Sequence, residues 1–297
     1  MMQLSAKEKI DLTAKWLFRA TGILIIAILG GIFFMLLWNT VAFLLEVKPL
    51  DFITGTQWNP AGHPATYGIL PLLVSTCLVT FGAMLIAIPI GIGTAAFLSE
   101  YAGKRLRNIL KPAIEMLAAV PSVAIGFLGI VILSPQLGEL SSQPNGLNAL
   151  NGAILLAIMA LPTIITVTED ALHSVPKSYK EASFGLGANP WQTLRKITIP
   201  ASAPGILAAI MLGVGRALGE TMTVLMATGN ASAFPKGFFH SVRTITATIA
   251  IEMGEVPYQT THYYGLFAIA TVLFLFTLIV NLIGEYYVNK FKKYQAT

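Results

Sequence analysis

Six long apolar stretches, each nearly free of charged residues, limit how this chain can fold. A helix needs about 20 apolar residues to cross the hydrocarbon core of a bilayer. The stretches that reach about this length are Ala20–Leu45, Ile69–Leu98, Ala113–Leu133, Leu150–Val167, Ile206–Thr228 and Leu266–Ile283. Only helices or closed barrels can satisfy their backbone polar groups inside lipid. We therefore expect an all-α membrane protein with about six transmembrane helices.

The composition excludes a soluble globular protein. Of the 297 residues, 55% are hydrophobic and 11% are charged, whereas soluble domains carry about 25% charged residues. So few charges cannot cover a surface in water, but they can cover the two ends of a bundle whose sides face lipid. The first apolar stretch is longer than the roughly 7–15-residue core of a signal peptide. We therefore interpret it as a span that is retained.

Basic residues lie mainly on one side of these stretches. When the flanks are assigned to alternating sides, one side holds fifteen Lys and Arg residues, and the other holds Lys48, Lys236 and Arg243. Cytoplasmic loops of membrane proteins carry this excess of positive charge. The asymmetry predicts six spans with cytoplasmic N- and C-termini. The remaining basic residue, Arg216, lies inside the fifth stretch.

The residue types that carry most enzyme chemistry are sparse. The chain has one cysteine, Cys77, and four widely separated histidines without metal-binding spacing. It lacks the G-x-x-x-x-G-K-[ST] phosphate loop of ATPases. We therefore expect no catalytic residues, no metal site, no cofactor bound by this chain and no nucleic-acid partner.

The largest cytoplasmic loop, residues 169–203, contains signals for two short helices. In order, these are a Ser178–Glu181 capping box, the turn glycines Gly185 and Gly187, a helix start at Asn189-Pro190, and a stop at Pro200. On these signals alone the loop is a helix–turn–helix segment beneath the membrane, which is also what an ordinary amphipathic loop would form.

The same loop resembles a family pattern. Its residues Glu181-Ala182-Ser183, Gly187, Ile197 and Ile199-Pro200 match the E-A-A-x3-G-x9-I-x-L-P loop of ABC import permeases, with Ser and Ile as conservative departures. The resemblance implies a coupling helix that docks on a separate ATPase subunit, which would use ATP and Mg. The residues expected to couple are Glu181, Ala182, Gly187, Ile197 and Pro200.

The fifth apolar stretch resembles one group within this family. Residues Gly213–Thr223 are similar to the G-R-A-x-G-E-T segment of phosphate-specific transport permeases of the PstC type, and the likeness extends over residues 67–285. It implies a type I ABC importer permease in the cytoplasmic membrane of a prokaryote. It also implies a heterodimer with a PstA-type permease, two ATPase subunits and an external phosphate-binding protein.

On this resemblance the chain divides into three parts. Residues 1–66 form an N-terminal cytoplasmic segment, the first transmembrane helix and an outer loop. Residues 67–285 form the permease domain, with the coupling loop at 178–200. Residues 286–297 form a cytoplasmic tail.

Arg216 and Glu220 are the candidate residues of the substrate path. An Arg in mid-span costs about 2.5–3.5 kcal/mol on insertion scales and should face a partner or a water-filled path. Glu220 is four residues on, so a continuous helix would place both on one face. They could be a packing ion pair, or they could line an anion path to which Thr221 or Thr223 adds a hydroxyl.

Two alternatives to phosphate import remain open from the residues. A permease for another oxyanion, such as molybdate, tungstate or sulfate, would suit the same Arg and Glu. A stand-alone secondary transporter or channel would not need the loop at 178–200.

Overall fold

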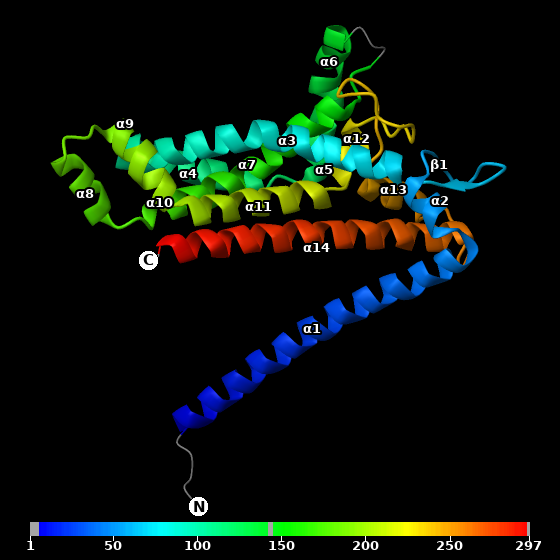
Figure 1. Ribbon diagram of the computed structural model, residues 1–297, viewed down its shortest axis with the longest axis horizontal. Helices are drawn as coiled ribbons and strands as arrows, with labels where there is room; N and C mark the ends of the chain where they lie inside the picture. The colour runs from blue at the N-terminus through cyan, green and yellow to red at the C-terminus, as the bar shows by residue number, and fades with distance from the viewer. Residues whose placement is uncertain (1–5, 142–144, 296–297) are drawn as a thin grey trace, which may run out of the picture.

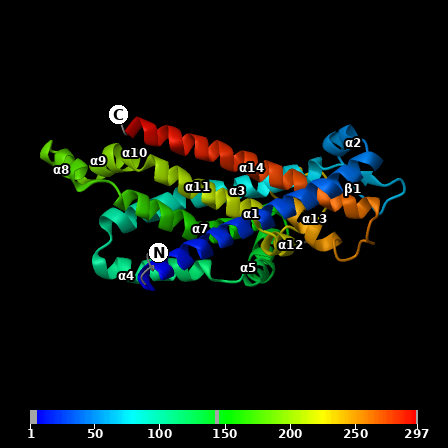
Figure 2. The same cartoon turned by 90° about the horizontal axis from the view of Figure 1, so that it is seen from below.

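Four long helices lie side by side and form the body of the molecule. They are α3 (Leu70–Ala96), α7 (Ala149–His173), α11 (Ala203–Gly219) and α14 (Thr261–Gln295). Their axes are roughly aligned in both views, and the chain of α11 runs opposite to the other three (Figures 1 and 2). The computed structural model describes residues 6–141 and 145–295. The remaining helices are α1 (Ala6–Glu46), α2 (Pro49–Thr54), α4 (Lys104–Ala118), α5 (Ser122–Leu128), α6 (Ser134–Ser141), α8 (Lys177–Gly185), α9 (Pro190–Thr193), α10 (Ile199–Ala201), α12 (Met222–Ala227) and α13 (Ile245–Glu252).

One isoleucine on α7 sits between two neighbouring helices. Ile164 is fully buried. A Cβ atom added to Gly91 of α3 would lie 2.6 Å from its side chain, and one added to Gly213 of α11 would lie 2.8 Å from it. Small residues let helix backbones approach closely in lipid, where packing rather than water drives association. A larger residue at either glycine would force α3 or α11 away from α7.

Helix α1 meets the bundle near Glu46 and diverges from it toward Ala6 (Figure 1). Most of its contacts are with α14. The rings of Phe33 and Phe274 lie 5.3 Å apart, and the hydroxyls of Thr40 and Thr271 are 2.7 Å apart. The earlier turns of α1 expose apolar side chains. Cover for these side chains must come from lipid or from another subunit.

Five helices are long and apolar enough to cross a membrane, and a bent pair makes up to six in the part of the chain that the structure describes. The first, second, fourth and sixth expected stretches lie in α1, α3, α7 and α14, and their expected positions are confirmed.

The expected third span, Ala113–Leu133, is wrong in its limits. Helix α4 ends at Ala118, and α5 begins at Ser122 after Pro121. Proline has no backbone N–H and disfavours helical geometry in the residue before it. The apolar helix that follows runs from Ser122 to Ser141 through the π-helical turn η2 (Gly129–Leu133).

The expected fifth span, Ile206–Thr228, is not one helix. Helix α11 ends at Gly219, Glu220 is extended with φ −70° and ψ 134°, and α12 begins at Met222. The physical reason lies in the side chain of Glu220, whose Oε1 accepts a hydrogen bond from the Thr223 backbone N–H at 3.2 Å. A carboxylate in this position satisfies a free donor at the start of a helix.

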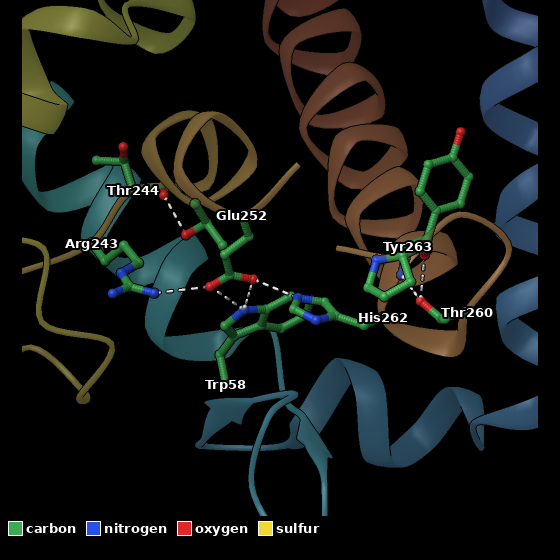
Figure 3. Close-up of polar contacts among 9 residues, drawn as sticks. Trp58, Arg243, Thr244, Glu252, Thr260, His262 and Tyr263 are labelled. Atoms are coloured by element: carbon green, nitrogen blue, oxygen red, sulfur yellow. Dashed lines mark hydrogen bonds and ion pairs between the residues drawn. The ribbon is translucent and has the colours of Figure 1, made fainter. Parts of the chain in front are cut away.

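One carboxylate connects segments far apart in sequence at the end of the molecule that holds α2 and α13 (Figure 1). Glu252, at the end of α13, accepts hydrogen bonds from Trp58 Nε1 at 3.1 Å and from an Arg243 guanidinium nitrogen at 2.9 Å, and its other contact is His262 Nε2 at 2.8 Å (Figure 3). Trp58 belongs to a short antiparallel ribbon of β1 (Trp58–Asn59) and β2 (Thr66–Tyr67). The short apolar helix α13 follows Arg243 and ends at Glu252.

Helix α8, the start of α1 and the end of α14 point toward one end of the molecule, and β1, α2 and α13 lie at the other (Figure 1). The first end carries the basic excess, so it is the expected cytoplasmic end.

Thiol labelling tests this orientation. In a Cys77→Ala background, Ser232→Cys should react with an impermeant thiol reagent in intact cells. Ser178→Cys, which is exposed at the opposite end, should react only after the cells are opened. Reaction of the Ser178→Cys variant in intact cells would reverse the assigned orientation.

Candidate functional site

The coupling loop folds into two short helices joined by a tight turn. Helix α8 ends at Gly185, and Gly187 has φ +81°, a conformation that favours glycine. The side chain of Asn189 accepts from the Gln192 N–H at 2.8 Å, and the Gln192 side chain accepts from the Asn189 N–H at 2.9 Å. This reciprocal cap starts α9 with Pro190 in its first turn. The expected glycine turn and the expected restart at Asn189-Pro190 are confirmed.

Two local predictions in this loop are wrong. The Ser178–Glu181 capping box does not form, because α8 begins at Lys177, two residues earlier than a Ser178 cap would place it, and its N-cap position is Pro176, which makes no side-chain cap. Pro200 does not end the helix. The π-helical turn η3 (Leu194–Thr198) precedes it, and the chain stays helical to Ala201 before it bends by 71° into α11.

A buried hydrogen bond fixes the two short helices against each other. The hydroxyls of Ser183 on α8 and Thr193 on α9 lie 2.9 Å apart and are buried. This bond explains why a hydroxyl can stand at the second alanine position of the family pattern. Around the turn the loop exposes large apolar side chains, among them Leu186 (89% exposed) and Trp191 (59%). Glu181, Ala182, Gly187 and Pro200 are also exposed, and Ile197 is half-buried.

Arg216 is half-buried near the end of α11, on a face that this chain leaves open. Leu212 and Gly219, one turn away on either side, are both exposed. Among the described residues the Arg216 side chain has no ion pair or hydrogen bond. Its guanidinium does not lie within 4 Å of the Glu220 carboxylate. The packing ion pair between Arg216 and Glu220 is therefore not formed in this structure.

Glu220 occupies the break between α11 and α12, and it is bound on both sides. Its carboxylate accepts from the N–H and the hydroxyl of Thr223, each at 3.2 Å, and its carbonyl accepts from the Thr246 hydroxyl of α13 at 2.8 Å. Thr221 is half-exposed at the same break, with its hydroxyl 3.4 Å from the Gly219 carbonyl. Thr223 is fully buried, and its hydroxyl also lies 3.1 Å from the Ser122 carbonyl of α5.

Sequence reasoning missed Thr246 and Ser122, which support Glu220 from residues 26 positions later and 98 positions earlier in the chain. No local spacing indicates such contacts. It also missed a cluster of charges where α4 begins and α7 ends, although Arg107 and Lys111 are four residues apart and so share a helix face.

This charge cluster is centred on a buried carboxylate. Glu169 of α7 is fully buried and lies 2.7 Å from Arg107 Nε and 3.0 Å from Lys111 Nζ, both on α4. Lys111 also contacts Asp170 at 3.4 Å. Burial lowers the pKa of Lys111. Its hydrogen bonds and charge interactions with Glu169 and Asp170 together raise the pKa by more than burial lowers it, so the net shift is upward. Lys111 therefore keeps its positive charge beside Glu169 at neutral pH.

In the part of the chain that the structure describes, no three His, Cys, Asp or Glu side chains are placed to hold a metal ion. The features on which a function can rest are therefore the exposed loop, the open Arg216 face and the helix break at Glu220.

Comparison with known proteins decides the family. A family model described as "binding-protein-dependent transport system inner membrane component" matches residues 87–293. The chain belongs to this family. The permease match therefore begins inside α3 and includes the coupling loop, the helix break and nearly all of α14.

Relatives of this permease cover most of its length. It is 38% identical over 243 residues to the probable ABC transporter permease protein YqgH of Bacillus subtilis (strain 168), a match that covers 80% of this chain and 79% of the relative. It is 34% identical over 290 residues to the phosphate transport system permease protein PstC of Mesorhizobium japonicum, covering 90% and 86%. A bacterial alginate ABC transporter, solved with a pentasaccharide-bound periplasmic protein, shares the fold at 14% identity with a TM-score of 0.62, covering 92% and 94%. The fold is that of a type I ABC importer permease.

Proposed function

We propose that this permease moves inorganic phosphate across the cytoplasmic membrane of a prokaryote, driven by ATP hydrolysis in a separate subunit. The observation that carries the proposal is the unpaired Arg216 on an open face of α11. Relatives over most of the chain are named phosphate transport permeases, which supports phosphate as the substrate.

The chemistry of Arg216 suits an oxyanion. Its guanidinium always carries a positive charge and offers forked N–H donors that match phosphate geometry. A charge in a membrane-spanning helix is costly unless it faces a partner or water. Since no described residue of this chain pairs with its side chain, Arg216 faces the second permease subunit or the path between the two.

Glu220 weakens the binding of the anion in this proposal. Its carboxylate lies at the break between α11 and α12, close along the chain to Arg216, and negative charge there weakens the anion site. Conduction requires an ion to leave as well as to enter. The half-exposed hydroxyl of Thr221 can donate to the passing anion, whereas buried Thr223 holds the Glu220 carboxylate in place.

The coupling loop meets the ATPase subunit in this proposal. Exposed apolar side chains such as Leu186 and Trp191 form a knob of the kind that fits a groove on a partner. The full importer then contains this chain, a PstA-type permease, two ATPase subunits and an external phosphate-binding protein. ATP and Mg are used by the ATPase subunits.

Uptake by cells distinguishes phosphate from other oxyanions. Cells that lack this chain should lose high-affinity uptake of radioactive phosphate, and the restored chain should recover it. Uptake of molybdate and sulfate should be unchanged in the same cells. Loss of molybdate uptake with normal phosphate uptake would contradict phosphate as the substrate.

A further inference from the structure

The coupling helix is bound to the membrane part of this chain by an ion pair on its inner side. Lys180 of α8 pairs with Glu100, and both side chains are about one-fifth exposed. Glu100 lies in η1 (Phe97–Tyr101), the π-helical turn that continues α3 at its cytoplasmic end. Lys180 thus points away from the exposed apolar residues of the loop and toward the helical bundle.

The turn that carries Glu100 is also bound to α7 and α4. Ser99 lies next to Glu100, and its hydroxyl is 3.0 Å from Nδ1 of His173 at the end of α7. On the other side of that ring, Nε2 lies 2.8 Å from an Arg107 guanidinium nitrogen. Arg can only donate hydrogen bonds, so Nε2 must be the acceptor and Nδ1 carries the hydrogen that is donated to Ser99. His173 therefore bridges η1 and α4.

From Arg107 the contacts continue into the membrane part. Arg107 binds Glu169 of α7, which also binds Lys111 one turn further along α4. Helix α4 leads through Pro121 into α5. The Ser122 carbonyl at the start of α5 lies 3.1 Å from the Thr223 hydroxyl, and the Thr223 N–H donates to the Glu220 carboxylate. A continuous series of contacts thus connects α8 to the helix break beside Arg216.

We propose that Lys180 and Glu100 are positioning residues for coupling, because they transmit movement of the docked α8 to α3, α4 and α7. A contact that is built only for docking would point toward the ATPase subunit, whereas this pair is turned inward. The proposal rests on the coupling role that is proposed above for α8. A continuous series of contacts does not by itself establish coupling. The test must therefore compare the single variants with the double variant of this pair.

The experiment uses the whole importer, in proteoliposomes that contain both permeases and the ATPase subunits, with binding protein and phosphate. Lys180→Glu and Glu100→Lys should each retain the ATPase subunits on purification and still hydrolyse ATP. Phosphate imported per ATP should fall about tenfold in each. The double variant, Lys180→Glu with Glu100→Lys, restores an ion pair and should recover most of the lost ratio. Lys180→Arg keeps the charge, so its ratio of phosphate imported per ATP should be close to that of the unaltered protein.

Lys177→Glu provides a matched control, because Lys177 is exposed on the same helix and has no ion pair among the described residues. Its ratio of phosphate to ATP should be unchanged. Three results would overturn the proposal. They are an unchanged ratio in both single variants, a double variant that assembles but recovers nothing, and loss of the ATPase subunits from Lys180→Glu, which would make Lys180 part of the docking surface. Failure of the coupling role itself would instead appear as normal uptake by loop variants such as Gly187→Val.

Discussion

Phosphate uptake is expected to fall by about 10- to 150-fold when Arg216 is replaced by glutamine, while the importer still assembles. Hydrogen bonds to charged groups contribute about 1.5–3 kcal/mol, which corresponds to this range in rate. Assembly should be intact because no carboxylate in residues 6–141 and 145–295 is paired with Arg216, so its loss leaves none of them unpaired. Arg216→Lys keeps the charge but loses the planar fork, so it should transport at an intermediate rate.

The double variant Arg216→Gln with Glu220→Gln separates a path role from a packing role. If the two side chains serve only packing, removing both charges should restore transport. If Arg216 faces the phosphate path, the double variant should assemble and still fail to transport. Glu220→Gln alone should bind phosphate and release it slowly, because the tempering negative charge is gone. The measurement is phosphate uptake by the assembled complex in proteoliposomes, and near-normal uptake by the double variant would contradict the path role.

Gly187→Val is expected to abolish ATP-driven uptake by releasing the ATPase subunits. A left-handed backbone costs a residue with a side chain roughly 1–2 kcal/mol, and a β-branched residue more. The turn between α8 and α9 should therefore reorganise and misplace Leu186 and Trp191. Uptake, and the amount of ATPase subunit that co-purifies, should both fall at least tenfold, while the amount of this chain in the membrane stays normal.

Gly187→Asn is the matched control, since asparagine tolerates the left-handed region much better than valine. It should retain uptake within about threefold. Glu181→Lys tests the same exposed surface through charge, and it should also lose uptake without loss of insertion. Normal uptake by both Gly187→Val and Glu181→Lys at normal expression would show that this loop does not couple the ATPase.

Hydropathy predicted the membrane helices well because lipid imposes a uniform demand on every residue of a span. The stretches inside α1, α3, α7 and α14 needed no knowledge of their neighbours. The turn at Gly187 and the helix start at Asn189 were also predictable, because both depend on residues within four positions along the chain.

The breaks in the third and fifth spans depend on contacts between distant residues. Glu220 leaves the helix because Thr223 and Thr246 bind it there, and no periodicity in residues 206–228 reflects this. The same holds for Glu169, whose partner Arg107 is 62 residues earlier. Proline was informative at residue 121 and misleading at residue 200, where the preceding π-helical turn let the helix continue.

The 71° bend at Ser202 joins the loop helices to α11 with a single residue between them. A connection of one residue allows little independent movement, so we expect rotation of the segment Pro190–Ala201 to tilt α11. At 1.5 Å per residue, Arg216 stands roughly 20 Å along that helix from the bend. A tilt of about 10° would then swing its backbone sideways by roughly 3 Å, comparable to the length of one hydrogen bond. Under the proposed function, the bent pair would convert a small rotation at the ATPase-facing end into the gain or loss of one contact between Arg216 and phosphate.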